Sequence, residues 1–209
     1  MDTAPICLFV YNRPFHTEIT LNELKKCNLS ADSDLFIFCD GPKKGINELE
    51  RQNIERVRDL CRNIIGFRNL YVIERDSNLG LGQSIIDGVN HLASLYKKII
   101  VLEDDLVVEK SFLEYMNFYL NFYENSKNVW HISGFQRDCW LQALQSPVFY
   151  THFMICTGWA TWTDRWERFN QNIDEIKSFI ISNKTFFDYS KLEISQQIKL
   201  NENRLNTWA

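Results

Sequence analysis

Short unbroken apolar runs alternate with longer amphipathic segments throughout the first half of this chain. The runs lie at residues 6–10, 35–39, 70–73 and 98–102. Unbroken apolar runs are typical of strands that are buried on both faces of a sheet, whereas half-exposed strands alternate apolar and polar residues. Because strands and helical segments follow each other in turn, we expect an α/β fold with a mostly parallel sheet sandwiched by helices.

The segments between these runs carry apolar residues at helical spacing. We expect one helix with its apolar face formed between Ile19 and Cys27, a second over residues 46–65 and a third around residues 85–92. The charged residues interleaved in the second segment are typical of a solvated helix face.

The second half of the chain has a different, aromatic-rich character, for which we expect a mixed arrangement. The expected elements are a helix at 111–124, a strand at 129–132, a loop at 136–146, a strand at 149–156, a Trp-rich helix after Gly158 and a polar helical tail at 172–204. No repeat or linker interrupts the sequence. We therefore expect a single domain over 1–209, with halves at 1–105 and 106–209.

Composition excludes several classes of protein. The net charge of -4 gives no basic patch for nucleic acid, and no apolar run approaches the roughly 18 residues of a membrane span. The N-terminus lacks the basic and apolar regions of a signal peptide. The six cysteines form no C-x-x-C pair, which disfavours a zinc site. We expect a reduced, cytoplasmic setting.

Polar residues follow each expected strand, where open parallel sheets bind their ligands. The most informative group is the acidic triplet Glu103-Asp104-Asp105. Three adjacent carboxylates repel one another, and a hard cation such as Mg²⁺ or Mn²⁺ would neutralise them together with substrate phosphates and water. The alternative is a simple helix cap at Asp104 or Asp105.

Two further strand ends carry charged residues. Arg13, next to Pro14, is suited to grip a phosphate or a base, or it is an ordinary surface arginine. Asp40 is suited to a base or ribose, although Asp-Gly-Pro is also common in turns. The glycine-rich turn 78–82 does not fit a dinucleotide fingerprint, since Ile85 occupies the place of the third glycine.

Five stretches, taken together, resemble a known family. They are Val10-Tyr11-Asn12-Arg13-Pro14, Phe38-Cys39-Asp40-Gly41, Asn78-Leu79-Gly80-Leu81-Gly82, Val101-Leu102-Glu103-Asp104-Asp105 and Gly158-Trp159-Ala160-Thr161-Trp162. In this order they resemble glycosyltransferases of the GT-A fold, which is Rossmann-like. Within that group the chain is similar to bacterial sugar transferases related to the eukaryotic N-acetylglucosaminyltransferases that begin complex N-glycans.

The resemblance implies a nucleotide-binding half at 1–105 and an acceptor-side half at 106–209. It implies a nucleotide-sugar donor, with a UDP-sugar favoured, and a glycan or other hydroxyl acceptor. Arg13, Asp40 and Gly80 would bind the nucleotide. Glu103 and Asp104 would hold the ribose and diphosphate region.

The resemblance also implies a metal, a wall and a base. Asp105 would ligate Mn²⁺ or Mg²⁺, and Gly158 with Trp159 would form a wall shared by donor sugar and acceptor. Transfer would invert the anomeric carbon, with a carboxylate as general base; Glu202 and Asp164 are the candidates. Family members usually continue beyond this length, so we expect the acceptor side to be truncated.

Two other functions compete with this interpretation. A sugar-nucleotide pyrophosphorylase would also combine a parallel sheet, a nucleotide and a metal, but it is expected to carry a glycine-rich loop where this chain has Tyr11-Asn12-Arg13-Pro14. A non-catalytic nucleotide-sugar or carbohydrate-binding domain would keep the fold and lack the base.

Overall fold

A computed structural model describes residues 3–135, 148–151, 154–170, 172, 174–175, 178 and 182. Its strands are β1 (Ile6–Val10), β2 (Asp34–Cys39), β3 (Asn69–Glu74), β4 (Lys98–Glu103), β5 (His131–Ser133) and β6 (Trp159–Trp162). Its α-helices are α1 (Pro14–Leu24), α2 (Glu48–Asn63), α3 (Leu81–Ala93), α4 (Phe112–Phe122) and α6 (Thr163–Trp166).

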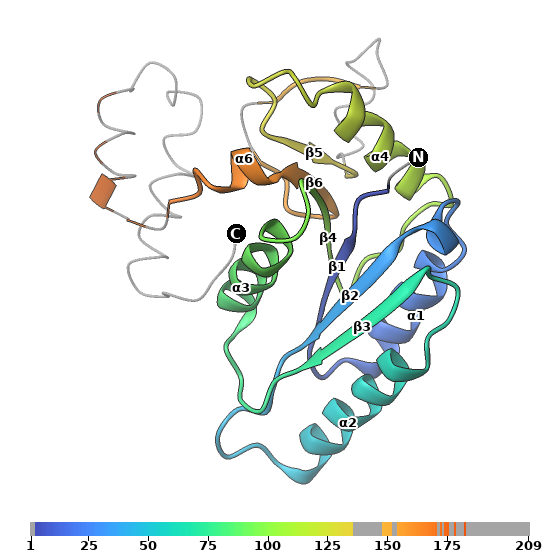
Figure 1. The fold of residues 1–209 in the computed structure, drawn as a ribbon. Coiled ribbons are helices and arrows are strands. Elements are labelled where there is room, and N and C mark those ends of the chain that lie inside the picture. Colours follow the sequence, from blue (N-terminus) through green and yellow to red (C-terminus); the bar gives the residue numbers. More distant parts are fainter. Residues whose placement is uncertain are drawn as a thin grey trace.

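The six strands form one sheet in the order β3-β2-β1-β4-β6-β5 (Figure 1). Neighbours among β1, β2, β3 and β4 are parallel, whereas β6 runs antiparallel to both β4 and β5. The α/β fold with a mostly parallel sheet is therefore confirmed, and the mixed pairing falls in the second half of the chain as expected.

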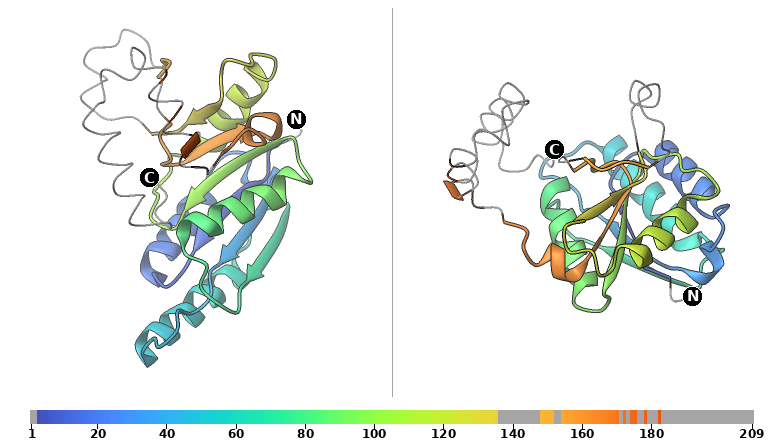
Figure 2. Two further views of the ribbon diagram at one scale, coloured as in Figure 1. Left: turned by 90° about the vertical axis from the view of Figure 1, so that its left-hand side faces the viewer. Right: turned by 90° about the horizontal axis from the view of Figure 1, so that it is seen from above.

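Each face of the sheet has its own apolar core. On one face Ile6, Leu8 and Val10 of β1 pack with residues of α1, α2 and α4; on the other, Cys7 and Phe9 pack with α3. Alternate residues of a strand point to opposite faces, so burial on both sides requires the unbroken apolar run read in the sequence. Helices cover both faces of the sheet, as the two further views show (Figure 2).

The Trp-rich segment is a strand, which corrects two predictions. Residues 149–151 and 154–156 are not in a strand, and the strand forms instead at β6, where a helix was expected. Trp159 faces the α3 side and Trp162 the opposite side, both almost fully buried. A short apolar run does not distinguish a helix from a strand by its pattern alone, and the open edge of the buried strand β4 selects the strand.

The other predicted elements lie close to the observed ones. Most helix and strand ends differ by up to three residues; for example, α1 ends at Leu24 and not near Cys27. Two helices begin earlier than expected, α1 at Pro14 and α3 at Leu81. The predicted loop 136–146 lies outside the described residues. Of the predicted helical tail, the structure describes positions 172, 174–175, 178 and 182, of which all but 172 are helical.

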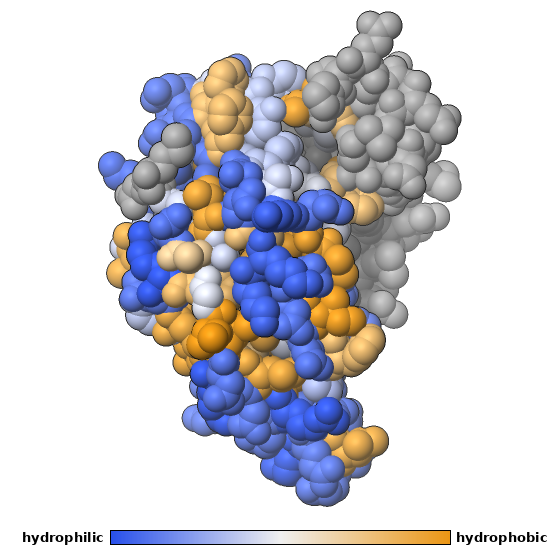
Figure 3. Space-filling model, turned by 90° about the vertical axis from the view of Figure 1, so that its right-hand side faces the viewer, coloured by the Kyte–Doolittle hydropathy of each residue, from blue (hydrophilic) through white to orange (hydrophobic). Residues whose placement is uncertain are grey.

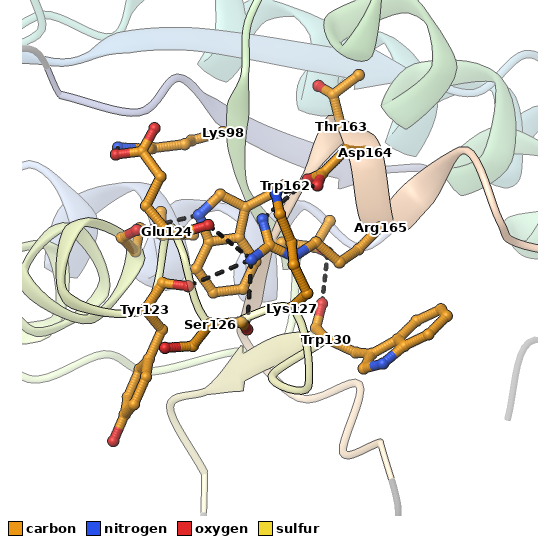
Figure 4. A network of polar contacts seen from close by, with 12 residues as sticks. Lys98, Tyr123, Glu124, Ser126, Lys127, Trp130, Trp162, Thr163, Asp164 and Arg165 are labelled. Atoms are coloured by element: carbon orange, nitrogen blue, oxygen red, sulfur yellow. Dashed lines mark hydrogen bonds and ion pairs between the residues drawn. The ribbon is translucent and has the colours of Figure 1, made fainter.

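Arg165 on α6 ties this short helix to the end of α4 (Figure 4). Its guanidinium lies 4.1 Å from the Trp162 ring and donates to the carbonyls of Tyr123 and Glu124, at 3.2 and 2.8 Å. A buried cation that contacts the carbonyl end of a helix is stabilised by the helix dipole. The link holds the antiparallel edge of the sheet against α4.

The charged residues of α2 form a solvated face, as predicted. The helix begins with a reciprocal capping box in which the Asn47 side chain accepts from the Glu50 N–H and the Glu50 carboxylate accepts from the Asn47 N–H. Ile54, Val57 and Cys61 are its buried residues. Figure 3 shows the hydrophilic surface at the lower end of the molecule, where α2 lies.

Among the described residues no helix combines the length and apolar character needed to span a membrane. The five cysteines within the described part are free thiols, and four of them are buried. This burial agrees with their place in apolar segments of the sequence.

A buried carboxylate fixes the start of the sheet at β2. Asp34 accepts two hydrogen bonds from the Arg68 guanidinium, at 2.8 and 2.7 Å, and further ones from Asn69 and Tyr96. The Arg68 contact is the main reason that the pKa of Asp34 lies below its ordinary value. The ionised carboxylate is therefore favoured in the folded chain over the unfolded one.

Replacing Asp34 by Asn should lower the free energy of unfolding at pH 7 by about 1–2 kcal/mol, because charged hydrogen bonds are lost at a half-exposed arginine. Since the folded-state pKa is depressed, the Asp34 contribution is complete above the unfolded pKa of about 4 and disappears as the pH falls through the folded value. Urea denaturation at pH 7 and pH 3 measures this. Asp59→Asn, on the exposed face of α2, is the control and should change stability little; an equal loss in both variants would contradict the prediction.

Candidate functional site

The acidic triplet lies at the carboxyl edge of the sheet, beside the end of β1. Parallel pairing sets Phe9 of β1 opposite Glu103, the last residue of β4. Arg13 follows β1 at the same edge and directly precedes α1. The register thus brings together charged residues that are about ninety positions apart in the sequence.

Arg13 contacts two of the three acids. One of its terminal nitrogens pairs with Asp104 and the other donates to Asp105 at 3.0 Å. The Asp104 side chain is 4% exposed, whereas the Asp105 and Arg13 side chains are 42% and 43% exposed. Asp104 also accepts from the Thr17 hydroxyl at 3.4 Å. Asp104 is therefore an inner anchor, and Asp105 presents its carboxylate to solvent.

Burial dominates the electrostatics of the triplet. It raises the pKa of the Glu103 carboxyl to about 7, with the charges of Asp105 and Asp104 adding to the shift and Arg13 opposing it. Burial also raises the pKa of Asp104, and the hydrogen bond from Arg13 counteracts it. The site concentrates more negative charge than a single guanidinium neutralises, which favours binding of an additional cation.

This arrangement changes the interpretation of Arg13. The sequence indicated a nucleotide ligand; the structure also makes Arg13 the internal counter-charge of the triplet. The contact of Thr17 with Asp104 was not anticipated from the sequence. Its only signal is spacing, because Thr17 lies one helical turn after Arg13 and also donates its hydroxyl to the Arg13 carbonyl.

The Asp40 carboxylate holds the glycine-rich turn 78–82 in place through hydrogen bonds. One carboxylate oxygen accepts from the Gly41 and Leu79 N–H groups at 2.9 and 3.0 Å. The other accepts from the Asn78 side chain and the Gly80 N–H at 2.9 and 3.1 Å. The side chain is buried and engages about as many donors as a carboxylate accepts. Its demonstrated contacts are within the protein, and its contact with a nucleotide stays a prediction.

The same turn begins helix α3. Gly80 has φ +79° at the N-cap of α3, a conformation that other residues rarely adopt. The turn 78–80 and the end of β2 are joined through Asp40, and Asn78 also donates to the Gly41 carbonyl at 3.1 Å. These contacts build one rigid rim beside the triplet, on which a nucleotide contact from Gly80 stays a prediction.

A cavity of about 280 Å³ opens next to the triplet on the α4 side. Leu106, the residue after Asp105, contributes to its lining together with Gly134, Phe135 and Gly158. Trp159 is not part of that lining, because its side chain is almost fully buried in the α3-side core. Of the two residues predicted to form a wall, only Gly158 reaches the cavity.

Asp164 does not lie near the triplet. Antiparallel pairing sets Trp162, two residues before it, opposite Lys98 at the start of β4, whereas Asp105 follows the end of β4. Its carboxylate is also occupied, by Lys127 at 2.6 Å and by the neighbouring arginine at 2.8 Å (Figure 4). The hydrogen bond from Lys127 lowers its pKa and weakens it as a base.

The second candidate base, Glu202, lies outside the described residues. With Asp164 at the opposite edge of the sheet, neither candidate is placed at the triplet by the described part of the chain.

The fit of the triplet to a divalent metal depends on its donor atoms. Across the described residues no group of three His, Cys, Asp or Glu side chains is arranged to hold a metal ion. Mg²⁺ nevertheless takes only one or two protein carboxylates and completes its shell with phosphates and water. An accessible Asp105 carboxylate beside buried Asp104 suits such a partly substrate-built site.

Comparisons with known proteins give distant likenesses. No family model matches the chain, and no curated protein matches it. Among solved structures, it is similar to S. aureus TarS at 16% identity and a TM-score of 0.41, covering 58% of this chain and 33% of that one.

Two further solved structures share more of this chain. M. tuberculosis glucosyl-3-phosphoglycerate synthase, in complex with Mn²⁺, UDP and phosphoglyceric acid, is 12% identical with a TM-score of 0.43, covering 78% of this chain and 56% of that one. The 4-diphosphocytidyl-2C-methyl-D-erythritolsynthase of Anaerococcus prevotii is 10% identical with a TM-score of 0.41, covering 98% and 85%. This chain thus spans a third of the chain that contains TarS residues 1–349 and 56% of glucosyl-3-phosphoglycerate synthase. These similarities are too low to assign it to a family.

Replacing Asp40 by Asn should lower the free energy of unfolding by about 1–3 kcal/mol, because the amide has one acceptor oxygen and would set its own N–H groups against backbone donors. Chemical denaturation measures the loss. Asp76→Asn, at an exposed position in the loop after β3 that supplies three of the Asp40 donors, is the matched control. Equal stability of the two variants would show that the Asp40 contacts do not hold the turn.

Proposed function

We propose that this chain is a metal-dependent glycosyltransferase that moves a sugar from a nucleoside diphosphate sugar to an acceptor hydroxyl. The proposal rests first on one observation: Arg13 and the Asp104–Asp105 pair meet at the carboxyl edge of a parallel sheet, beside a cavity large enough for a small substrate group. Ligands of open α/β sheets bind at this edge. Arg13 and a divalent metal held by the neighbouring acids would together supply the positive charge that binds a diphosphate.

Each residue has a defined role in this proposal. Asp104 is the inner anchor that orients Arg13, and Arg13 contributes positive charge toward the departing diphosphate. Asp105 would hold Mn²⁺ or Mg²⁺, which when bound would act as a Lewis acid on that diphosphate. The rigid turn at Gly80 would support the nucleotide, and Gly158 would border the acceptor cavity. The base that removes the hydroxyl proton is not assigned.

The finer points of the proposal come from the sequence resemblance. The five stretches favour a UDP-sugar, an inverting reaction and a relation to the N-acetylglucosaminyltransferases. They also favour one domain over 1–209 with a nucleotide-binding half and an acceptor-side half. A cytoplasmic setting remains part of the proposal.

A second function, donor binding without efficient transfer, is favoured by a specific observation. Asp164 lies at the far edge of the sheet from the triplet and is held by Lys127. General bases contribute typically 10²–10⁴-fold to transfer, so their absence would leave binding intact and transfer slow. Release of UDP from UDP-sugars in the presence of Mn²⁺ distinguishes an enzyme from a binding domain.

The metal role of Asp105 predicts linkage between metal and nucleotide. UDP should raise the unfolding temperature more with Mn²⁺ than with EDTA, because only a bridging cation joins the diphosphate to the carboxylate. At UDP one hundred times its Kd the stabilisation should be about 2.7 kcal/mol. Thermal unfolding followed by fluorescence measures both conditions.

Asp105→Asn should remove the Mn²⁺ dependence and keep the fold, since this side chain is half exposed. Glu167→Gln, at an exposed carboxylate just after α6 and away from the triplet, is the control and should retain the dependence. Identical UDP shifts with Mn²⁺ and with EDTA in the unaltered protein would refute the metal bridge.

Arg13 should contribute to both stability and UDP affinity. Arg13→Ala leaves Asp104 buried without its cation and removes a charged hydrogen bond to the diphosphate, so we expect UDP binding to weaken by about 1.5–3 kcal/mol. Arg13→Lys keeps the charge but cannot donate to two carboxylates in the same geometry. Its UDP affinity should therefore lie between those of the unaltered protein and Arg13→Ala. Calorimetric titration measures the affinities; an unchanged affinity in Arg13→Ala would limit this residue to its role within the triplet.

A further inference from the structure

Helix α4 carries a second apolar stripe besides its buried one, and only part of this second stripe packs against the core. Leu113, Met116 and Leu120 form the buried stripe that contacts the core. A helix on the surface of a globular protein normally presents polar residues on its other sides. The second stripe of α4 is instead aromatic, and it extends past the helix through Tyr123.

We name this second stripe the aromatic stripe; its members are Tyr115, Phe118, Tyr119, Phe122, Tyr123 and Tyr150. The helical members are three or four positions apart, so they lie on one side of the helix. Ring centroids are 4.8 Å apart for Tyr115–Tyr119, 5.9 Å for Tyr119–Tyr123 and 6.0 Å for Tyr123–Tyr150. The rings therefore form a continuous row and not isolated surface residues.

Tyr115, Tyr119 and Tyr123 are half-buried against the core, and the other three members of the stripe are open to solvent within the described structure. Phe118, Phe122 and Tyr150 are 58%, 65% and 75% exposed. Large contiguous apolar surface is uncommon on a folded protein unless it binds something. The Tyr150 hydroxyl donates one hydrogen bond to the Tyr123 hydroxyl at 2.9 Å. This bond fixes the two rings relative to each other and so preorganises this end of the row.

One end of the stripe reaches the candidate site. Tyr115 lines the cavity that also contains Leu106, next to Asp105, and its hydroxyl donates to the Ser133 carbonyl at 3.2 Å. The other end lies near the start of β4, because Lys98 donates to Asn121 on the last turn of α4. Helix α4, whose course Figure 1 shows, thus carries the row from the cavity toward the start of β4.

We propose that the aromatic stripe binds a neutral oligosaccharide, which is the acceptor of the transfer proposed above and places its terminal sugar in the cavity. The inference rests on that proposed function for the role of the ligand, but not for its binding. Sugar rings offer apolar C–H faces and hydroxyl edges, which match phenyl faces and phenol hydroxyls. The rings carry no charge at neutral pH, so they provide no counter-ion for a phosphorylated or basic ligand. Because the rings form a row spaced by about one helical turn, an oligosaccharide of several sugars can contact more of them than a single sugar can.

The test is calorimetric titration of the full chain, without donor, with disaccharides and hexasaccharides of three neutral series: β1,4-linked N-acetylglucosamine, β1,4-linked glucose and α1,4-linked glucose. At least one hexasaccharide should bind about tenfold more tightly than its disaccharide, because it contacts more rings. Phe118→Ala and Phe122→Ala, at the two most exposed rings of α4, should each weaken that binding about tenfold. Leu95→Ala, at an exposed apolar residue after α3, should leave it unchanged.

The outcomes are separable from those of the proposed function. Thermal unfolding and UDP binding with Mn²⁺ are measured on each variant, and both should match the unaltered protein. If the unaltered protein does not bind UDP, the proposed transferase function is refuted, whereas the glycan-binding result is unaffected. No hexasaccharide binding at millimolar concentration, or equal binding by all variants, overturns the stripe. So does self-association that Phe122→Ala abolishes without any glycan binding, which would assign the surface to a second copy of the chain.

Discussion

The parallel pairing of β1 with β4 is the constraint on which the rest of the structure depends. These two strands are central and buried on both faces, so their polar residues, Lys98 and Glu103, lie at the two ends of β4. The register between them then decides which strand ends meet. Because Phe9 lies opposite Glu103, the loop after β1 places Arg13 next to the acids that follow β4.

The two aspartates at this edge differ in how deeply they are buried. Asp104 is enclosed and paired, whereas Asp105 is accessible and shares the same guanidinium. A buried carboxylate without a partner would be costly, so Arg13 already has a role in the folded state. This structural role explains why the sequence alone gives an incomplete account of Arg13: a side chain at a strand end is read as available for a ligand, although part of its interaction is already used internally.

The parallel half of the fold was predictable from the sequence because each buried strand leaves an unbroken apolar run. The second half was less so. Trp159 and Trp162 suggested a helix, but they lie on opposite faces of a strand, and only the free edge of β4 decides between the two. Within the site, the acidic triplet and Arg13 were identified by position. Three of the four donors around Asp40 were not, because they come from the loop after β3, which meets the end of β2 only in three dimensions. The sequence also did not show the place of Asp164, because the antiparallel direction of β6 puts it near the start of β4 and away from the triplet.

The closeness of the two loops beside Asp40 also limits how this protein can change. A methyl group added at Gly41 would lie 2.6 Å from the Arg75 carbonyl oxygen and would collide with the backbone of Ser77. Those atoms belong to main chain and cannot rotate away. Substitutions at position 41 therefore force the loops after β2 and β3 apart, however conservative the new side chain is. Mutational libraries that aim to alter ligand preference at this edge will find tolerance in the exposed loop tip around Asp76, while alanine at position 41 will already be eliminated.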